Sequence, residues 1–169
     1  ALSTANEYAL NTYWEFFLQL NFDPTTTNFT RIYLTSDQAD LKGSLNGYFV
    51  QIGETGATDG FNLYRQGGTS TTKIITGPQK TRANANILLA KIRVTRDADG
   101  NWELLTDVSG GSSFTSEGTV VDNTFKTSAF MGVYCKYATA SRYNQYIFDD
   151  FMVDELVPDI IPPTLKNVS

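Results

Sequence analysis

The stretch AKIRVTRDADGNWELLTD, residues 90–107, has the pattern of two β-strands joined by a tight turn. Asp99 and Gly100 accept the positive φ angles that a two-residue hairpin turn requires. On both sides of the turn, polar residues alternate with small or apolar ones, which are Ala90, Ile92, Val94, Trp102 and Leu104. Alternation places these residues on one face, because successive side chains of a strand point to opposite faces. The stretch therefore predicts a β-hairpin with one buried face.

The same period of two recurs along most of the chain. The longest run is YWEFFLQLNF, residues 13–22, in which every second residue is apolar: Trp14, Phe16, Leu18, Leu20 and Phe22. Shorter runs occur at residues 29–36, 46–53 and 61–66. Turn signals recur about every 8–15 residues, as in sandwiches and barrels. We therefore expect an all-β fold of two antiparallel sheets packed face to face, with long loops at residues 35–47 and 108–119.

Composition excludes several classes of function. The net charge is −5, from 18 acidic and 13 basic residues, and no basic run stands out, so we expect no nucleic-acid partner. No apolar run approaches the roughly 20 residues that span a bilayer, so we expect no membrane insertion. The chain has no histidine, which excludes histidine-based nucleophile systems and metal sites. Its one cysteine, Cys135, lies in the apolar run AFMGVYCKY and is expected to be a buried free thiol.

The C-terminal segment DELVPDIIPPTLKNVS, residues 154–169, has a different character. Three prolines fall within six residues, and proline cannot donate to a strand ladder. We therefore expect a β-sandwich domain at residues 1–155 and a proline-rich linker at residues 156–169. The last eleven residues, DIIPPTLKNVS, resemble the opening of bacterial immunoglobulin-like domains, so the linker is expected to lead to such a module.

Four stretches together resemble one family: YWEFFLQLNFDPTTTNFTRIYLTSD, LNGYFVQIGETGATDGFNLYRQGG, IRVTRDADGNWELLTD and YIFDDFMVDEL. They look like the concanavalin A-like lectin/glucanase jelly-roll domain of secreted multidomain surface proteins from Bacteroidetes-type bacteria. Those proteins carry lamin-tail and immunoglobulin-like modules. The resemblance runs from about Tyr13 to Glu155 and implies a jelly-roll sandwich, neighbouring domains, and secretion or display at the cell surface. Family members have further strand-forming sequence before this point, so we expect a sandwich that lacks an N-terminal strand.

The adjacent carboxylates of Asp149 and Asp150 interrupt an aromatic strand. Many jelly-roll carbohydrate-binding modules end in a similar strand, whose first carboxylate holds a structural calcium, and this resemblance points to Asp149. Calcium takes about 6–8 oxygen ligands, and no DxDxDG loop is present to supply them. The alternative is a carboxylate that accepts hydrogen bonds at a sheet edge. Asp97, Asp99 and Gly100 also resemble part of a calcium-binding loop, but the chemistry of the hairpin turn explains these residues.

Several strands carry tyrosine, arginine and glutamine side chains. Sugar sites need aromatic rings against the apolar sugar face and planar groups that bind hydroxyls. The residues expected to bind a ligand are Arg31, Tyr33, Gln51, Tyr64, Arg65 and Tyr134. The alternative is structural, since tyrosine is common in sheets because it suits a half-buried pleated surface.

These patterns favour a non-catalytic module that binds a polysaccharide or other glycan and needs no cofactor. Glycosidases on related sandwiches use two carboxylates on one strand face, and the corresponding Glu-x-Asp-x-Glu pattern does not occur. A second hypothesis is a structural or adhesion module that spaces or docks neighbouring domains. A third is a glycoside hydrolase whose two carboxylates come together from distant parts of the sequence.

Overall fold

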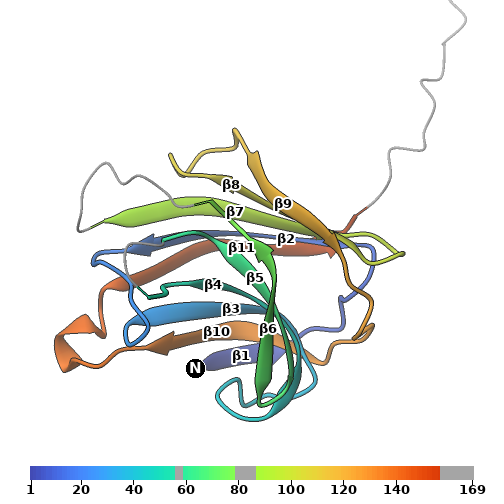
Figure 1. The fold of residues 1–169 in the computed structure, drawn as a ribbon, viewed down its shortest axis with the longest axis horizontal. Coiled ribbons are helices and arrows are strands. Elements are labelled where there is room, and N and C mark those ends of the chain that lie inside the picture. The colour runs from blue at the N-terminus through green and yellow to red at the C-terminus, as the bar shows by residue number, and fades with distance from the viewer. Residues whose placement is uncertain (56–58, 79–86, 157–169) are drawn as a thin grey trace, which may run out of the picture.

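The computed structural model describes residues 1–55, 59–78 and 87–156, and Figure 1 shows their two layers of antiparallel strands. The strands are β1 (Leu2–Ala5), β2 (Thr12–Leu20), β3 (Phe29–Ser36), β4 (Leu45–Ile52), β5 (Asn62–Gly68), β6 (Ser70–Thr76), β7 (Leu88–Arg96), β8 (Asn101–Asp107), β9 (Thr115–Val121), β10 (Phe130–Lys136) and β11 (Tyr146–Glu155). One layer is a six-stranded sheet in the order β1-β10-β3-β4-β5-β6. The other is a five-stranded sheet in the order β11-β2-β7-β8-β9. The expected all-β sandwich is therefore confirmed.

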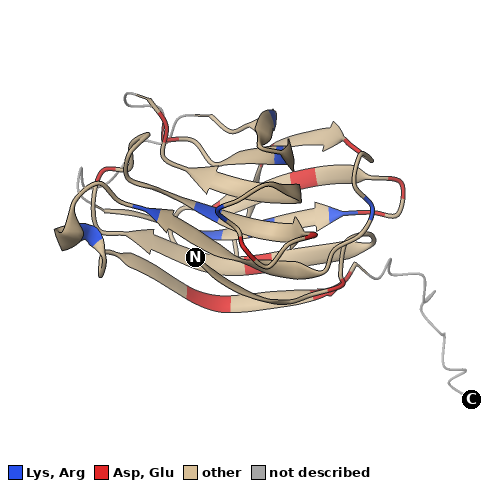
Figure 2. Cartoon of the chain, turned by 90° about the horizontal axis from the view of Figure 1, so that it is seen from below, with Lys and Arg blue, Asp and Glu red and all other residues tan. Residues whose placement is uncertain are grey.

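The core lies between the two sheets and consists of the side chains that the period of two predicted to face inward. Trp14, Phe16, Leu18 and Leu20 of β2 are buried, as is Phe22 just beyond the strand. Trp102 of β8 is also buried, and its ring stacks on Trp14 with centroids 5.8 Å apart. Figure 2 shows that charged residues lie over both layers and their connections, without a continuous stripe of either sign.

One charged side chain, Arg96 of β7, is fully buried in this apolar interior. Its guanidinium carbon lies 4.6 Å from the ring centroid of Trp102 and 5.0 Å from that of Tyr48. Its terminal nitrogens donate to the carbonyl oxygens of Ala9 at 3.0 Å and Phe125 at 2.8 Å. Arg96 thus fastens two chain segments, before β2 and after β9, to one end of the sandwich. Cation–π contacts and charge-assisted hydrogen bonds offset the cost of its burial.

Asp122 carries a buried negative charge at this end of the core. It accepts a 2.6 Å hydrogen bond from the Tyr48 hydroxyl and forms a 2.5 Å ion pair with Arg65. Burial works to raise the pKa of Asp122. Hydrogen bonds from Tyr48 and Thr124, together with the charge of Arg65, outweigh that effect, so the pKa lies below its usual value.

The strand β11 forms one edge of the five-stranded sheet and contains the adjacent carboxylates Asp149 and Asp150. Its pairing with β2 shifts register between Asp149 and Met152, which marks a β-bulge. Asp150 sits in this bulge with a φ of 54°, a conformation that aspartate tolerates better than most residues. At the opposite end of the chain, β1 forms an edge of the six-stranded sheet by pairing with β10. We conclude that the Asp149–Asp150 pair marks a backbone irregularity at a sheet edge.

The segment expected to be a linker, residues 156–169, lies outside the described residues apart from Leu156, and the proposed linker stays a prediction. The Leu156 backbone N–H donates to the Asn11 carbonyl at 2.7 Å, which brings the end of β11 beside the start of β2. Within the described part of the chain, no helix has the length and hydropathy needed to cross a membrane.

Replacing Arg96 with alanine is expected to lower the free energy of unfolding by about 3 kcal/mol or more, because removal of this buried cation leaves the carbonyl groups that it binds without a partner. The matched control is Arg93→Ala on the outer face of the same strand. Arg93 pairs with Glu15, which keeps Lys91 as a second partner, so we expect a loss below about 1 kcal/mol. Chemical denaturation of both variants measures the difference. Equal losses would contradict the structural role of Arg96.

Acidification should expose the contribution of Asp122. Because its pKa is lowered in the folded state, its stabilising contribution is present above the unfolded pKa and is lost as pH falls through the folded pKa. The free energy of unfolding should therefore decrease between about pH 5 and pH 2. In Asp122→Asn this decrease should be smaller than in the native chain, as denaturation at each pH would show. Identical pH profiles would contradict the lowered pKa.

Candidate functional site

The outer face of the six-stranded sheet, opposite the core, gathers most of the residues expected to bind a ligand. Register explains this, because Arg31 of β3 lies opposite Tyr134 of β10 and Gln51 of β4, while Phe49 of β4 lies opposite Tyr64 of β5. We call this surface the aromatic face and define it as Phe29, Arg31, Tyr33, Phe49, Gln51, Tyr64 and Tyr134. Arg31, Gln51, Tyr64 and Tyr134 remain partly exposed there.

Arg31 is held at the centre of the aromatic face. Its guanidinium carbon lies 4.5 Å from the Phe49 ring centroid and 5.3 Å from that of Phe29. Its Nε donates to Gln51 Oε1 at 2.9 Å, and Gln51 Nε2 in turn donates to the carbonyl of Gly53 at 3.1 Å. The terminal nitrogen Nη2 has no hydrogen-bond partner among the described residues. Arg31 therefore presents an oriented, partly exposed donor above a sheet of aromatic rings.

Tyr64 extends this surface toward the edge of the sheet. Its ring stacks on Phe49, with centroids 5.1 Å apart and planes 7° apart, and its hydroxyl donates to the Glu54 carboxylate. Glu54 also accepts from Asn62 at 3.0 Å and from Lys73 at 2.6 Å. Burial, followed by the hydrogen bond to Glu54, raises the pKa of Tyr64. Tyr64 thus stays a neutral ring with a fixed hydroxyl at physiological pH.

Tyr33 does not lie where the sequence analysis expected a ligand contact. The connection 37–44 crosses the aromatic face, and Leu41 and Leu45 pack with Tyr33 and Phe49 into a second, smaller apolar cluster. Tyr33 is completely buried, and its hydroxyl donates to Gln66 Oε1 at 2.7 Å. The expectation that Tyr33 contacts a ligand is therefore corrected. The connection 37–44 covers its ring, so Tyr33 packs inside the smaller apolar cluster.

Arg65 is also separated from the aromatic face. Successive side chains of β5 point to opposite faces of the sheet, so Arg65, which follows Tyr64, lies on the side that faces the core. Its Nη1 donates to Asp122 Oδ2 at 2.5 Å and to Thr124 Oγ1 at 3.0 Å. Arg65 is therefore part of the ion pair that closes one end of the sandwich, and the expectation that it binds the same ligand as Tyr64 is corrected.

The sequence analysis missed other residues of this site. Phe49 could have been found, since it alternates with Val50 and shares a face with Gln51. Glu54 and Lys73 gave no signal, because only the pairing of β5 with β6 brings Lys73 beside Tyr64 and its partner carboxylate. Glu54 and Lys73 form an ion pair beside the aromatic face.

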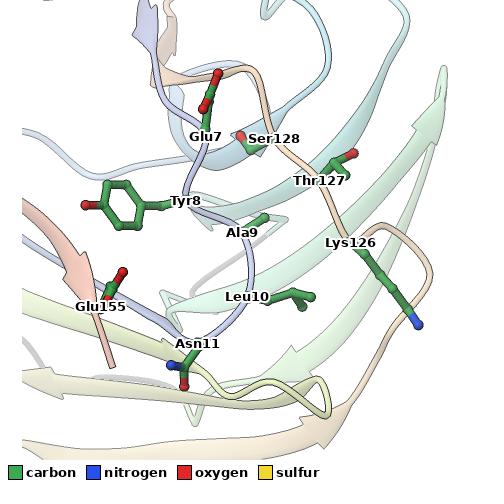
Figure 3. A pocket seen from close by; sticks show the side chains of 9 residues that line it. All are labelled: Glu7, Tyr8, Ala9, Leu10, Asn11, Lys126, Thr127, Ser128 and Glu155. Carbon is green, nitrogen blue, oxygen red and sulfur yellow. The ribbon is translucent and has the colours of Figure 1, made fainter. Parts of the chain in front are cut away.

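A separate cavity of about 490 Å³ lies at the end of the sandwich where Leu156 joins Asn11. Figure 3 shows its walls, which come mostly from the connections before β2 and after β9, with Glu155 at the end of β11. The Lys126 side chain points away from Tyr8 and Glu155 in this view. These side chains do not converge on a common point, so this cavity is a weaker candidate site than the aromatic face.

Asp149 was expected to hold a structural calcium. In the structure its side chain is exposed, and its Oδ1 accepts the backbone N–H of Asp150 at 2.8 Å. Asp150 Oδ2 lies 3.7 Å from the Lys91 ammonium nitrogen. Across residues 1–55, 59–78 and 87–156, no three acidic, histidine or cysteine side chains come together as metal ligands. The described residues therefore place no cluster of acidic side chains at Asp149 that would favour calcium, which takes about 6–8 oxygen ligands, and the calcium site stays a prediction.

Calcium is accordingly expected to leave the stability unchanged. Melting temperatures measured in excess calcium and in excess chelator should agree within about 1 °C, because only a ligand that binds the folded state raises stability. The control is Asp149→Ala, measured under both conditions. A calcium-dependent rise of about 3 °C or more that disappears in Asp149→Ala would restore the calcium site.

Comparison with known proteins adds information on the fold. No protein-family model matches the chain, and no curated protein matches it in sequence. A carbohydrate binding module from Bacillus subtilis is similar in structure, with a TM-score of 0.59 and 11% identity over 92% of this chain and 78% of that chain. A xylan β-1,4-xylosidase from Bacillus halodurans is similar over 90% of this chain and 30% of that chain, with a TM-score of 0.56 and 8% identity. At these identities the likeness shows the fold, a jelly-roll β-sandwich of the concanavalin A-like kind.

Proposed function

We propose that this chain is a non-catalytic carbohydrate-binding module of an exported bacterial surface protein, and that the glycan binds on the aromatic face. One observation carries the proposal. The partly exposed side chains of Arg31, Gln51, Tyr64 and Tyr134 occupy one solvent-facing side of a sheet whose other side is packed into the core.

The chemistry of these groups suits a sugar. Tyrosine rings pack against the apolar face of a pyranose, while the guanidinium and amide groups are planar partners for its hydroxyls. Hydrogen bonds to Gln51 and stacking on Phe49 already orient Arg31 in the free protein. Preorganisation of this kind favours affinity, because less side-chain entropy is lost on binding.

Two further observations support the proposal. The fold is shared with a carbohydrate binding module from Bacillus subtilis. The sequence resembles jelly-roll domains of Bacteroidetes-type surface proteins, which is the basis for proposing export, a cell-surface location and neighbouring domains. These contextual parts of the proposal rest on the sequence resemblance alone.

Catalysis is the less favoured function. A glycosidase needs two carboxylates about 5–10 Å apart, one of them available as an acid. Glu54 lies at the aromatic face, but its oxygens already accept hydrogen bonds from Tyr64, Asn62 and Lys73. A carboxylate engaged in this way is suited to hold Tyr64 in place.

A structural or adhesion module is the second candidate, and a specific observation favours it. Three apolar side chains of the edge strand β11 are exposed, at 39% for Ile147, 43% for Phe151 and 49% for Met152. Exposed apolar surface at a strand edge is typical of sites where another protein docks. This candidate predicts association through β11 without any glycan.

The proposal is tested by screening the domain against neutral and acidic polysaccharides. For a glycan that binds, Arg31→Ala and Tyr64→Ala should each weaken affinity about tenfold or more, because each removes a preoriented contact. The control Arg93→Ala alters an arginine on the outer face of the five-stranded sheet and should leave affinity unchanged. Calorimetry measures the affinities, and a melting curve checks the fold of each variant.

Absence of binding across the panel, from folded protein, would overturn the proposal and favour the structural module. Binding that Arg93→Ala weakens, and Arg31→Ala does not, would place the ligand on the other sheet.

A further inference from the structure

A depression of about 500 Å³ opens beside β10, where that strand extends beyond its partner β1. Its walls are Ala1 and Leu2, Lys42 of the connection 37–44, and residues 133–137. Tyr134 lines this depression and is also a residue of the aromatic face. The two surfaces therefore meet at Tyr134, and one extended ligand can contact both.

The depression is basic although the whole chain is acidic. Of the residues that the structure describes, Lys42 and Lys136 line it and no acidic side chain does. The nearest acid in the sequence to Lys42 is Asp40, whose carboxylate accepts the backbone N–H of Lys42 at 3.0 Å. This local positive charge contrasts with the net charge of −5 of the whole chain.

A third cation stands next to this depression. The Lys136 ammonium nitrogen lies 5.6 Å from the Phe29 ring centroid, and the Arg31 guanidinium carbon lies 5.3 Å from the same centroid. Tyr134 meets Phe29 edge to face, with centroids 5.9 Å apart. Arg31 and Lys136 thus share one aromatic ring, whose face attracts cations.

The described residues supply no acidic partner for these cations. The ion pairs of the described part of the chain engage Arg65, Lys73, Lys91 and Arg93. Neither Arg31, Lys42 nor Lys136 forms an ion pair within 4 Å there. Glu54, at the aromatic face, is already bound to Lys73 at 2.6 Å. No acidic residue of the described part of the chain thus pairs with these three cations, whose side chains are exposed or partly exposed.

We propose that the ligand is an anionic glycan, whose sugars carry carboxylate or sulfate groups that bind among Arg31, Lys136 and Lys42. This inference rests on the proposed function and adds its ligand class. The aromatic rings contact the sugar faces, while the cations pair with the acidic substituents. Arginine and lysine both bind such anions, arginine with two parallel hydrogen bonds and lysine as a point charge.

The test compares glycans that differ only in charge. Polygalacturonate and its fully methyl-esterified form share one backbone, and a sulfated galactan provides the second anionic chemistry. We expect the charged polymer to bind about tenfold or more tightly than its neutral ester, and its affinity to fall as salt rises from about 50 to 300 mM. Lys136→Ala should weaken binding of the charged polymer and leave any binding of the ester unchanged.

Lys126→Ala, which changes an exposed lysine of the cavity in Figure 3, is the matched control and should bind like the native protein. Tight binding of the sulfated galactan alone would support the inference with sulfate as the anion. Equal affinity for the charged and the esterified polymer would overturn it and leave the proposed function standing. No binding to any polysaccharide would overturn both.

Discussion

Burial of one face of each sheet against the other is the constraint on which the rest of this structure depends. A strand that gives alternate side chains to the core leaves the intervening ones on the opposite face. In the six-stranded sheet, the inward residues Ile32, Val50 and Leu63 therefore leave Arg31, Phe49 and Tyr64 outside. The core thus organises the candidate site, because cross-strand pairing sets the spacing of the outer side chains.

A second layer of packing decides how much of that outer face a ligand can reach. Leu41 and Leu45 cover Tyr33 and Phe49, so part of the face is a small core and the rest is open. Because Phe49 is packed in this way, its ring is a fixed surface that both the Arg31 guanidinium and the Tyr64 ring contact. The open part combines rings with cations, and the acid beside it is already neutralised by Lys73. This arrangement is the basis on which we propose glycan binding rather than acid–base catalysis.

The sequence predicted the fold well because an alternating pattern reports burial directly. Trp14, Phe16 and Trp102 are all inside, as expected. The site was predicted only in part. Arg65 could have been assigned to the inner side, since it alternates with Tyr64. The burial of Tyr33 could not, because it depends on a loop that folds back over the sheet. The environment of Asp149 was equally hidden, since a bulge follows from the register between two distant strands.

The most direct test of this account is a backbone NMR titration of the domain with oligogalacturonate. The account predicts that the amide chemical shifts of β3, β4, β5 and β10 change around the aromatic face. The amide chemical shifts of the five-stranded sheet should stay unchanged. Shifts confined to β11 and its neighbours, or no shifts with any acidic or neutral oligosaccharide, would contradict the claim that the outer face of the six-stranded sheet is a glycan-binding surface.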